Sequence, residues 1–292
     1  MNLRLSRREA LVAGLSAVPL VALPGLAKAS PLHAERKMHL GLVTYNVAKD
    51  WDLDTIIKNL TAAKIEGVEF RTTHSHGVEP SLDADGRKRV RDKCGAAGFK
   101  QISLGSICEF QSADPANVKQ NIDTCQEFIR LAKDIGARAV KVRPNGAPKN
   151  IPLDKTLEQI GKSLAEVGKI GADNGVEIWM EVHGGITQLA LNSRKIMDFC
   201  GHPNVGVTWN SNNTDVVDGS VKSSFELLDK FIRCCHITEL WSDYPYHEFF
   251  QMLNGIGYDR FTLCEVGSSI KSEDGAAFLN CYRGLWNELS KA

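Results

Sequence analysis

Four polar side chains stand at corresponding places in the sequence, each at the end of a short apolar run: Glu181, Asn210, His236 and Glu265. Two carboxylates, an amide oxygen and an imidazole form an oxygen-rich set of donors. Such a set suits Mn²⁺, Mg²⁺, Zn²⁺ or Fe²⁺ better than copper or a thiolate-bound metal. Two acids held together without a cation would cost free energy. The four residues therefore predict one divalent-metal site, provided that the fold brings the ends of the four runs together.

Four further side chains are candidates for proton transfer or for contact with a substrate. Lys141 lies inside an apolar run, where a buried ammonium needs a partner or a lowered pKa, so we expect it in an active site. His74 and His76 flank a serine on a predicted loop, and they are either acid–base groups above the metal or exposed loop residues. Trp241 also stands on a predicted loop, where its ring either stacks on a ring of the ligand or packs against the protein.

Short apolar runs and longer amphipathic segments alternate eight times from residue 38 onward. The short runs are rich in Val, Ile and Leu, which is typical of parallel strands that are covered on both faces. The predicted strands are His39–Tyr45, Gly67–Arg71, Gln101–Gly105, Ala139–Arg143, Glu177–Glu181, Gly206–Asn210, Cys234–Ile237 and Thr262–Glu265. This alternation predicts an α/β fold, a (β/α)₈ barrel, whose typical size is about 250 residues.

A barrel would bring the candidate residues together, because barrel active sites are built from the carboxyl ends of the strands. Adjacent strands lie about 4.8 Å apart, so side chains at one depth can converge on one point. A doubly wound sheet is the alternative, but residues 46–50 after the first strand contain no glycine-rich phosphate-binding turn. Gly67, Gly98, Gly136 and Gly175 precede predicted strands, and we expect them to end the preceding helices in the left-handed conformation.

The N-terminus is typical of an export signal. Ser6–Leu11 contains Arg7 and Arg8 in a twin-arginine pattern, an apolar stretch follows, and Ala27–Ala29 is a small-x-small cleavage site. The predicted protein is periplasmic or secreted, with an uncleaved membrane anchor as the alternative. The predicted organisation is a twin-arginine signal peptide at 1–29, a short linker at 30–37 and a single barrel domain at 38–292.

Composition excludes several classes of protein. The chain of 292 residues is 43% apolar and 24% charged, which is typical of a globular protein. Of its 35 basic and 35 acidic residues, four basic and one acidic lie in the first 29, so 31 basic and 34 acidic residues remain in the body. A slightly acidic body argues against nucleic acid as a partner. None of the eight cysteines forms a CxxC pair, and we expect buried thiols rather than disulfides.

The order glutamate, acid or amide, histidine, glutamate on the last four predicted strands resembles that of the xylose isomerase-like TIM barrels. This family includes sugar-phosphate isomerases, ketose 3-epimerases, inosose dehydratases and the endonuclease IV group. The resemblance covers about residues 38–292. The segments that carry it are Gly67–Arg71 (GVEFR), Glu181–Gly185 (EVHGG), Val205–Asn210 (VGVTWN) and Glu265.

The resemblance implies a divalent metal held by Glu181, the residue at the end of the sixth strand, His236 and Glu265. In the epimerases of the family, the two glutamates also remove and return a proton next to a carbonyl that the metal polarises. Three further positions match residues that touch substrate hydroxyls or oxyanions: Arg71, Lys141 and His183.

The sequence departs from the family pattern in two places. The family's Asp-x-x-His after the sixth strand is here Asn210–Asn213, and its x-Lys-Asp after the metal-binding histidine is here Ile237–Glu239. Loss of the aspartate removes one negative charge, so the two glutamates would just balance a divalent ion. The affinity for the metal is then expected to be weaker, and the reaction need not be the usual epimerisation.

The sequence therefore predicts an exported, divalent-metal-dependent carbohydrate isomerase or epimerase. One alternative is a β-eliminating lyase or hydrolase that acts on an oxidised (3-keto) sugar or glycoside, and another is a non-catalytic sugar-binding barrel. The expected partner is a small sugar or glycoside, without nucleic acid and without stable membrane association after cleavage. The sequence leaves a homo-oligomer open.

Overall fold

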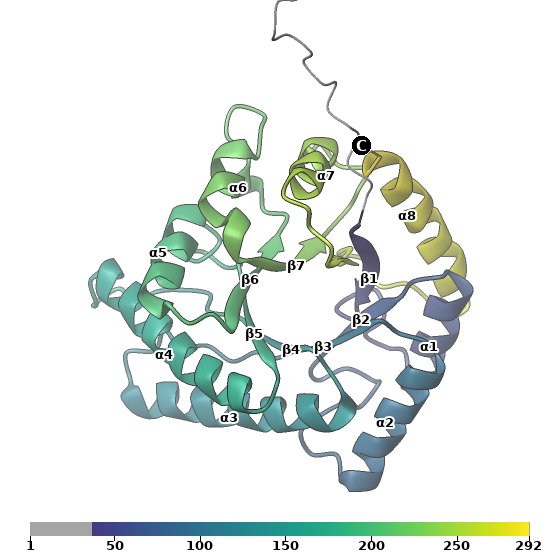
Figure 1. The fold of residues 1–292 in the computed structure, drawn as a ribbon, viewed down its shortest axis with the longest axis horizontal. Helices are drawn as coiled ribbons and strands as arrows, with labels where there is room; N and C mark the ends of the chain where they lie inside the picture. The colour runs from purple at the N-terminus through teal and green to yellow at the C-terminus, as the bar shows by residue number, and fades with distance from the viewer. Residues whose placement is uncertain (1–36, 292) are drawn as a thin grey trace, which may run out of the picture. The chain divides into compact units, whose positions relative to one another are not determined.

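A computed structural model describes residues 37–291, so the predicted signal peptide and nearly all of the linker lie outside the described part of the chain. The strands are β1 (His39–Val43), β2 (Gly67–Arg71), β3 (Gln101–Gly105), β4 (Ala139–Val142), β5 (Glu177–Glu181), β6 (Val205–Asn210), β7 (Ile232–Ile237) and β8 (Phe261–Cys264). They form a closed parallel barrel in chain order, which β1 completes by pairing with β8. Figure 1 shows the strands as a central ring surrounded by helices. The predicted (β/α)₈ TIM barrel is confirmed.

A helix follows each strand. The helices are α1 (Leu53–Ala62), α2 (Ala84–Ala96), α3 (Pro115–Ile135), α4 (Leu153–Asp173), α5 (Ala190–Cys200), α6 (Lys222–Leu228), α7 (Tyr246–Gly255) and α8 (Gly275–Leu289). Aspartates cap the first three, since the side chains of Asp52, Asp83 and Asp114 accept hydrogen bonds from backbone N–H groups of the first turn. Pro115 occupies the first position of α3, where a missing N–H costs nothing.

One predicted helix end is wrong. Gly98, Gly136 and Gly175 have positive φ, at 74°, 75° and 71°, as expected for glycines that end helices. After α1, however, Lys64 takes the left-handed conformation with φ 54°, and Gly67 is the first residue of β2. A Cβ on Gly67 would lie 2.4 Å from a ring carbon of Phe261. Gly67 is therefore required by close packing inside the barrel rather than by helix termination.

The hydrophobic core has two parts. The larger part contains residues from the strands and the helices, and a small separate cluster consists of Val43, Ala139, Trp179, Cys234, Phe261 and Leu263. Because strand side chains alternate between faces, residues two positions further along share the face of this small cluster. These are Lys141 after Ala139, Glu181 after Trp179, His236 after Cys234 and Glu265 after Leu263. The small cluster thus lies directly beneath the predicted site and closes it from below.

The state of the cysteines and the character of the helices can be compared with what the sequence predicts about thiols and about the membrane. All eight cysteines lie in the described part of the chain as free thiols, with seven of them buried and Cys281 exposed. Among the described residues, no helix combines the length and apolar character that a membrane crossing requires.

Candidate functional site

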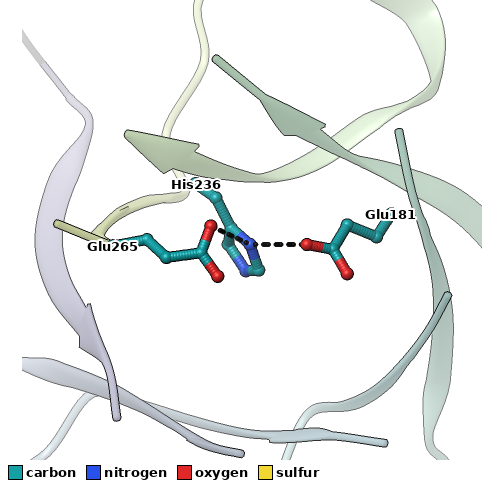
Figure 2. A group of neighbouring side chains, drawn as sticks. All are labelled: Glu181, His236 and Glu265. Carbon is teal, nitrogen blue, oxygen red and sulfur yellow. Dashed lines mark ion pairs between the residues drawn. The ribbon is translucent and has the colours of Figure 1, made fainter. Parts of the chain in front are cut away.

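The ends of the last four strands bring the predicted metal residues to one place. His236 Nδ1 lies 3.3 Å from Glu181 Oε1 and 3.2 Å from Glu265 Oε2. One ligand atom from each of these three side chains can be chosen so that all lie within 4.8 Å of one another. Figure 2 shows the two carboxylates approaching the imidazole from opposite sides. Asn210 is paired in register with His236 on the neighbouring strand, so it lies at the same depth.

His236 is fully buried among acids. Its Nδ1 makes no hydrogen bond within the described part of the chain, although two carboxylates lie within 3.3 Å of it. Burial opposes a charged imidazole, but the carboxylates of Glu265 and Glu69 outweigh burial and hold the pKa of His236 well above its ordinary value. A buried nitrogen that faces two carboxylates without bonding either of them suits a shared cation. The donor set of two carboxylates and one imidazole therefore fits a divalent metal.

Lys141 holds one of these glutamates in its charged form. Its Nζ lies 2.7 Å from Glu181 Oε2, and both side chains are only 3% exposed. Burial would raise the pKa of Glu181, but the charges of Lys141 and His236 hold it well below its ordinary value. The other oxygen of Glu181 accepts a hydrogen bond from Asn210 Nδ2 at 3.3 Å. Asn210 thus contacts the site through its amide, and its role as an oxygen ligand stays a prediction.

Glu69 is a buried residue of this site that the sequence does not single out. It points into the barrel from β2, is completely buried, and its Oε2 lies 3.4 Å from His236 Nε2 and 3.5 Å from Ser103 Oγ. Gly105 makes room for it, since a Cβ there would lie 2.7 Å from Glu69 Oε1. Glu69 thus faces the ring nitrogen that points away from Glu181 and Glu265. The sequence does contain a signal for this residue, because a glutamate in the middle of the apolar strand β2 must be buried and therefore needs partners.

A polar pocket of about 350 Å³ opens above these residues. Its lining residues are Tyr45, Arg71, Lys141, Arg143, Glu181, His183, Asn210, Ser211, Asn212, Thr238, Glu239, Glu265 and Gly267. The guanidinium of Arg71 lies over the ring of Tyr45, 5.6 Å from its centroid. Burial, with the charge of Arg143, lowers the pKa of Arg71 from its ordinary value. Many hydrogen-bonding groups of mixed charge make this pocket suited to a hydroxyl-rich ligand.

Three predicted substrate contacts do not line this pocket. His76 is fixed by the backbone: Val78 N–H donates to its Nδ1 at 2.9 Å, and its Nε2 lies 2.9 Å from the Arg71 carbonyl oxygen. His74 stacks on Tyr45, and burial lowers the pKa of both histidines to about 4. Trp241 is 59% exposed and meets Tyr282 edge-on. The roles of His74, His76 and Trp241 therefore stay predictions without support from the pocket.

A larger cavity of about 650 Å³ lies on the outside of the barrel between α3 and α4. Its charged side chains include Glu158, which pairs with Lys155 and Lys162 on the surface. The smaller pocket at the strand ends is the better candidate site, because the buried acids and the histidine lie at its base.

The fold has many relatives among solved structures, whereas no curated protein matches the sequence. The chain is similar to L-ribulose 3-epimerase, with a TM-score of 0.73 and 16% identity over 87% of this chain and 94% of that one. It is similar to D-psicose 3-epimerase from Clostridium cellulolyticum H10, with a TM-score of 0.68 and 15% identity over 87% and 94% of the two chains. For 3-keto-D-glucoside 4-epimerase from E. coli, the TM-score is 0.68 and the identity 12% over 88% and 100%.

Sequence comparison identifies the family directly. The family's sequence profile, that of the xylose isomerase-like TIM barrel, matches residues 57–280. This range is most of the barrel and includes all four predicted metal residues. The barrel closure, the strand-end acids and this match agree, and the chain belongs to the xylose isomerase-like TIM barrel family.

Proposed function

We propose that the protein is a divalent-metal-dependent sugar epimerase or isomerase that works by proton abstraction next to a carbonyl. The observation that carries the proposal is the arrangement of Glu181 and Glu265 on opposite sides of His236 at the base of a polar pocket. Inversion at a carbon atom needs one group to remove a proton from one face and another to return a proton to the other face. Two separate carboxylates meet that requirement.

The proposed metal residues are Glu181, His236 and Glu265, with Asn210 as a fourth. When bound, the metal would polarise the substrate carbonyl and stabilise the negative charge that develops on its oxygen.

Formal charges at the site agree with a divalent ion. Three carboxylates, those of Glu69, Glu181 and Glu265, share the site with the ammonium of Lys141. A divalent cation beside a neutral His236 brings the formal sum of this group to zero. In the metal-free protein the raised pKa of His236 favours a protonated imidazole, and this cation supplies part of the missing positive charge.

The other residues of the pocket divide into two roles. Lys141 keeps Glu181 ionised, so that this carboxylate is ready to accept a proton. Glu265 is 13% exposed in its side chain and borders the open pocket, from which it can take up the proton that it returns to the substrate, while Glu181 releases the abstracted proton after turnover. Arg71 and His183 line the rim and can donate hydrogen bonds to sugar hydroxyls.

Two further observations support a sugar substrate. The three structural relatives described above are sugar epimerases. The predicted export signal favours an unphosphorylated sugar or glycoside in the periplasm or outside the cell.

The test uses protein purified after export and analysed for bound metal. The metal-loaded protein is incubated with ketohexoses and keto-glycosides in D₂O, and deuterium incorporation next to the carbonyl is followed by NMR. We expect one equivalent of a divalent metal, together with exchange that Glu265→Gln abolishes. The matched control is Glu166→Gln on the outer face of α4, which should retain both properties.

The products distinguish the alternatives. An inverted carbon identifies an epimerase, and release of the group attached to the sugar identifies a β-eliminating lyase. Metal-loaded protein that exchanges no proton on any of these sugars would contradict the proposal and favour a sugar-binding barrel.

A further inference from the structure

A second polar cavity of about 500 Å³ lies beside the first at the carboxyl ends of the strands. It is formed by the segment after β3 and the first turns of α3, and its lining includes Glu109, Gln111, Asn117 and Asn121. Arg143 lines both cavities, so the two adjoin at this side chain. The second cavity contains none of the proposed metal residues.

A chain of hydrogen bonds connects the two cavities. His183 of the first cavity lies with its Nδ1 2.8 Å from Asn145 Oδ1, and Asn145 Nδ2 donates to Glu109 Oε1 at 2.6 Å. The other oxygen of Glu109 accepts a hydrogen bond from Gln111 Nε2 at 2.6 Å. Arg143 Nη2 lies 3.9 Å from Glu109 Oε1. The wall between the cavities is thus a fixed polar network rather than an apolar partition.

The lining favours a neutral, hydroxyl-rich ligand. Its charged groups are Glu109 and Arg143, which face each other, and amides and a serine hydroxyl supply the remaining polar groups. Two side chains of this lining, Arg143 and Gln111, each contain a buried atom, Nε and Oε1, that has no hydrogen-bond partner within residues 37–291. The polar side chains that the cavity can reach, those of Gln111, Ser112, Asn117 and Asn121, can donate to or accept from sugar hydroxyls. Ile107 is exposed beside them and offers an apolar surface for the C–H face of a ring.

We propose that the second cavity binds the second sugar unit of a glycoside whose reacting ring lies in the first cavity. This inference rests on the proposed function, because it takes the ring above Glu181 and Glu265 to be the one that reacts. Arg143 then lies near the glycosidic linkage, since it is the residue that the two cavities share. A phosphorylated sugar is disfavoured, because the single cation of the second cavity faces Glu109.

A glycoside substrate has a chemical consequence for the position of the carbonyl. We take the reacting ring to be the glycosyl unit, whose anomeric carbon the glycosidic bond locks as an acetal, so this ring cannot open to give a carbonyl there. The carbonyl that acidifies the C–H bond must then be a ketone elsewhere on the ring. The epimerisation breaks and remakes one C–H bond without a net change of oxidation state. A dehydrogenation of a ring hydroxyl must therefore supply the substrate.

The test compares a methyl keto-glucoside with keto-disaccharides of the same configuration, using metal-loaded full-length protein. Asn117 is exposed on the first turn of α3 and lines only the second cavity, so Asn117→Trp should fill it. We expect kcat/KM for the disaccharides to fall at least about tenfold more than for the methyl glucoside. The matched control is Gln120→Trp, which lies on the same helix, is also exposed and lines neither cavity. It should change neither value.

A second variant and a binding measurement separate failure of this inference from failure of the proposed function. Gln111→Leu removes a polar side chain from the lining of the second cavity and should also weaken disaccharides selectively. The second cavity is not a sugar site if both variants lower kcat/KM equally for the methyl glucoside and the disaccharides, or if the wild-type values of kcat/KM for the two are equal. Either result would leave the proposed epimerase function unaffected. Equilibrium binding of the unoxidised parent disaccharides is measured in parallel. If no sugar exchanges protons but Asn117→Trp still abolishes preferential binding of disaccharides, the result supports the second cavity as a sugar site and contradicts the proposed function.

Discussion

Replacement of Lys141 by methionine isolates the charge balance of the site. Lys141 Nζ lies 2.7 Å from Glu181 Oε2, with both side chains 3% exposed. Lys141→Met keeps the length of the side chain but leaves Glu181 as a buried carboxylate without its cation. Breaking a buried pair by removal of one partner typically costs about 3–5 kcal/mol. We expect a loss of this size in the free energy of unfolding of the metal-free protein.

Bound metal should reduce this loss, because a divalent cation next to Glu181 replaces the missing ammonium. Urea unfolding with and without excess metal measures both values. The double variant Lys141→Met/Glu181→Gln removes the unpaired charge, so it should lose less than the sum of the two single variants. The surface control is Lys162→Met, whose Nζ lies 2.8 Å from Glu158 Oε1 with 72% of the lysine side chain exposed. Its loss should stay below about 1 kcal/mol. A loss that small for Lys141→Met itself would refute the assigned role of the pair.

Four other outcomes follow from the site and the sequence. Glu265→Gln should abolish metal binding in calorimetry, whereas retained affinity would remove Glu265 from the ligands. Asn210→Asp should tighten metal binding and Asn210→Ala should weaken it, and equal affinities would show that β6 does not contribute. The pKa of His76 is about 4 in the folded protein, below its unfolded value, so its contribution to stability is present above about pH 6.5 and is lost as the pH falls toward 4. Wild type should therefore lose more stability over that range than His76→Asn, and parallel pH curves would contradict this. Arg7→Lys with Arg8→Lys should keep the protein in the cytoplasm, and normal export of this variant would contradict the twin-arginine route. An exported protein whose N-terminal sequence starts at Met1 or Asn2 would contradict cleavage of the signal peptide.

Local signals in the sequence predict most of the framework. Each predicted strand matches an observed strand, because buried parallel strands have a composition that can be recognised without their neighbours. The differences lie at the ends: the strand predicted at His39–Tyr45 ends at Val43, and the strand predicted at Cys234–Ile237 begins at Ile232. The local sequence assigns Gly67 to a helix end, but what requires a glycine there is close packing against Phe261 of β8. Phe261 is far away in the sequence, so local signals do not reveal this contact.

The candidate site divides in the same way. Glu181, His236 and Glu265 stand at the carboxyl ends of β5, β7 and β8, so the barrel order of the strands predicts that they converge. Glu69 meets His236 from a strand that is not its neighbour, and the two residues are 167 positions apart. Glu69 and His236 meet only because the barrel closes and both side chains point into its interior. The position of His76 depends similarly on how its loop turns back onto the backbone of Arg71.

Closure of the barrel has a consequence for the order of events during synthesis. Leu40–Leu42 pair with Thr262–Cys264, and the next residue, Glu265, forms a backbone hydrogen bond to Ile237. The first strand to leave the ribosome therefore waits for the last one, and one of the proposed metal residues arrives only with that last strand. A nascent or truncated chain lacks the complete site, so tight retention of metal would report that synthesis has reached the end of the barrel. For a protein exported in the folded state, metal loading would then mark the molecules that are ready to leave.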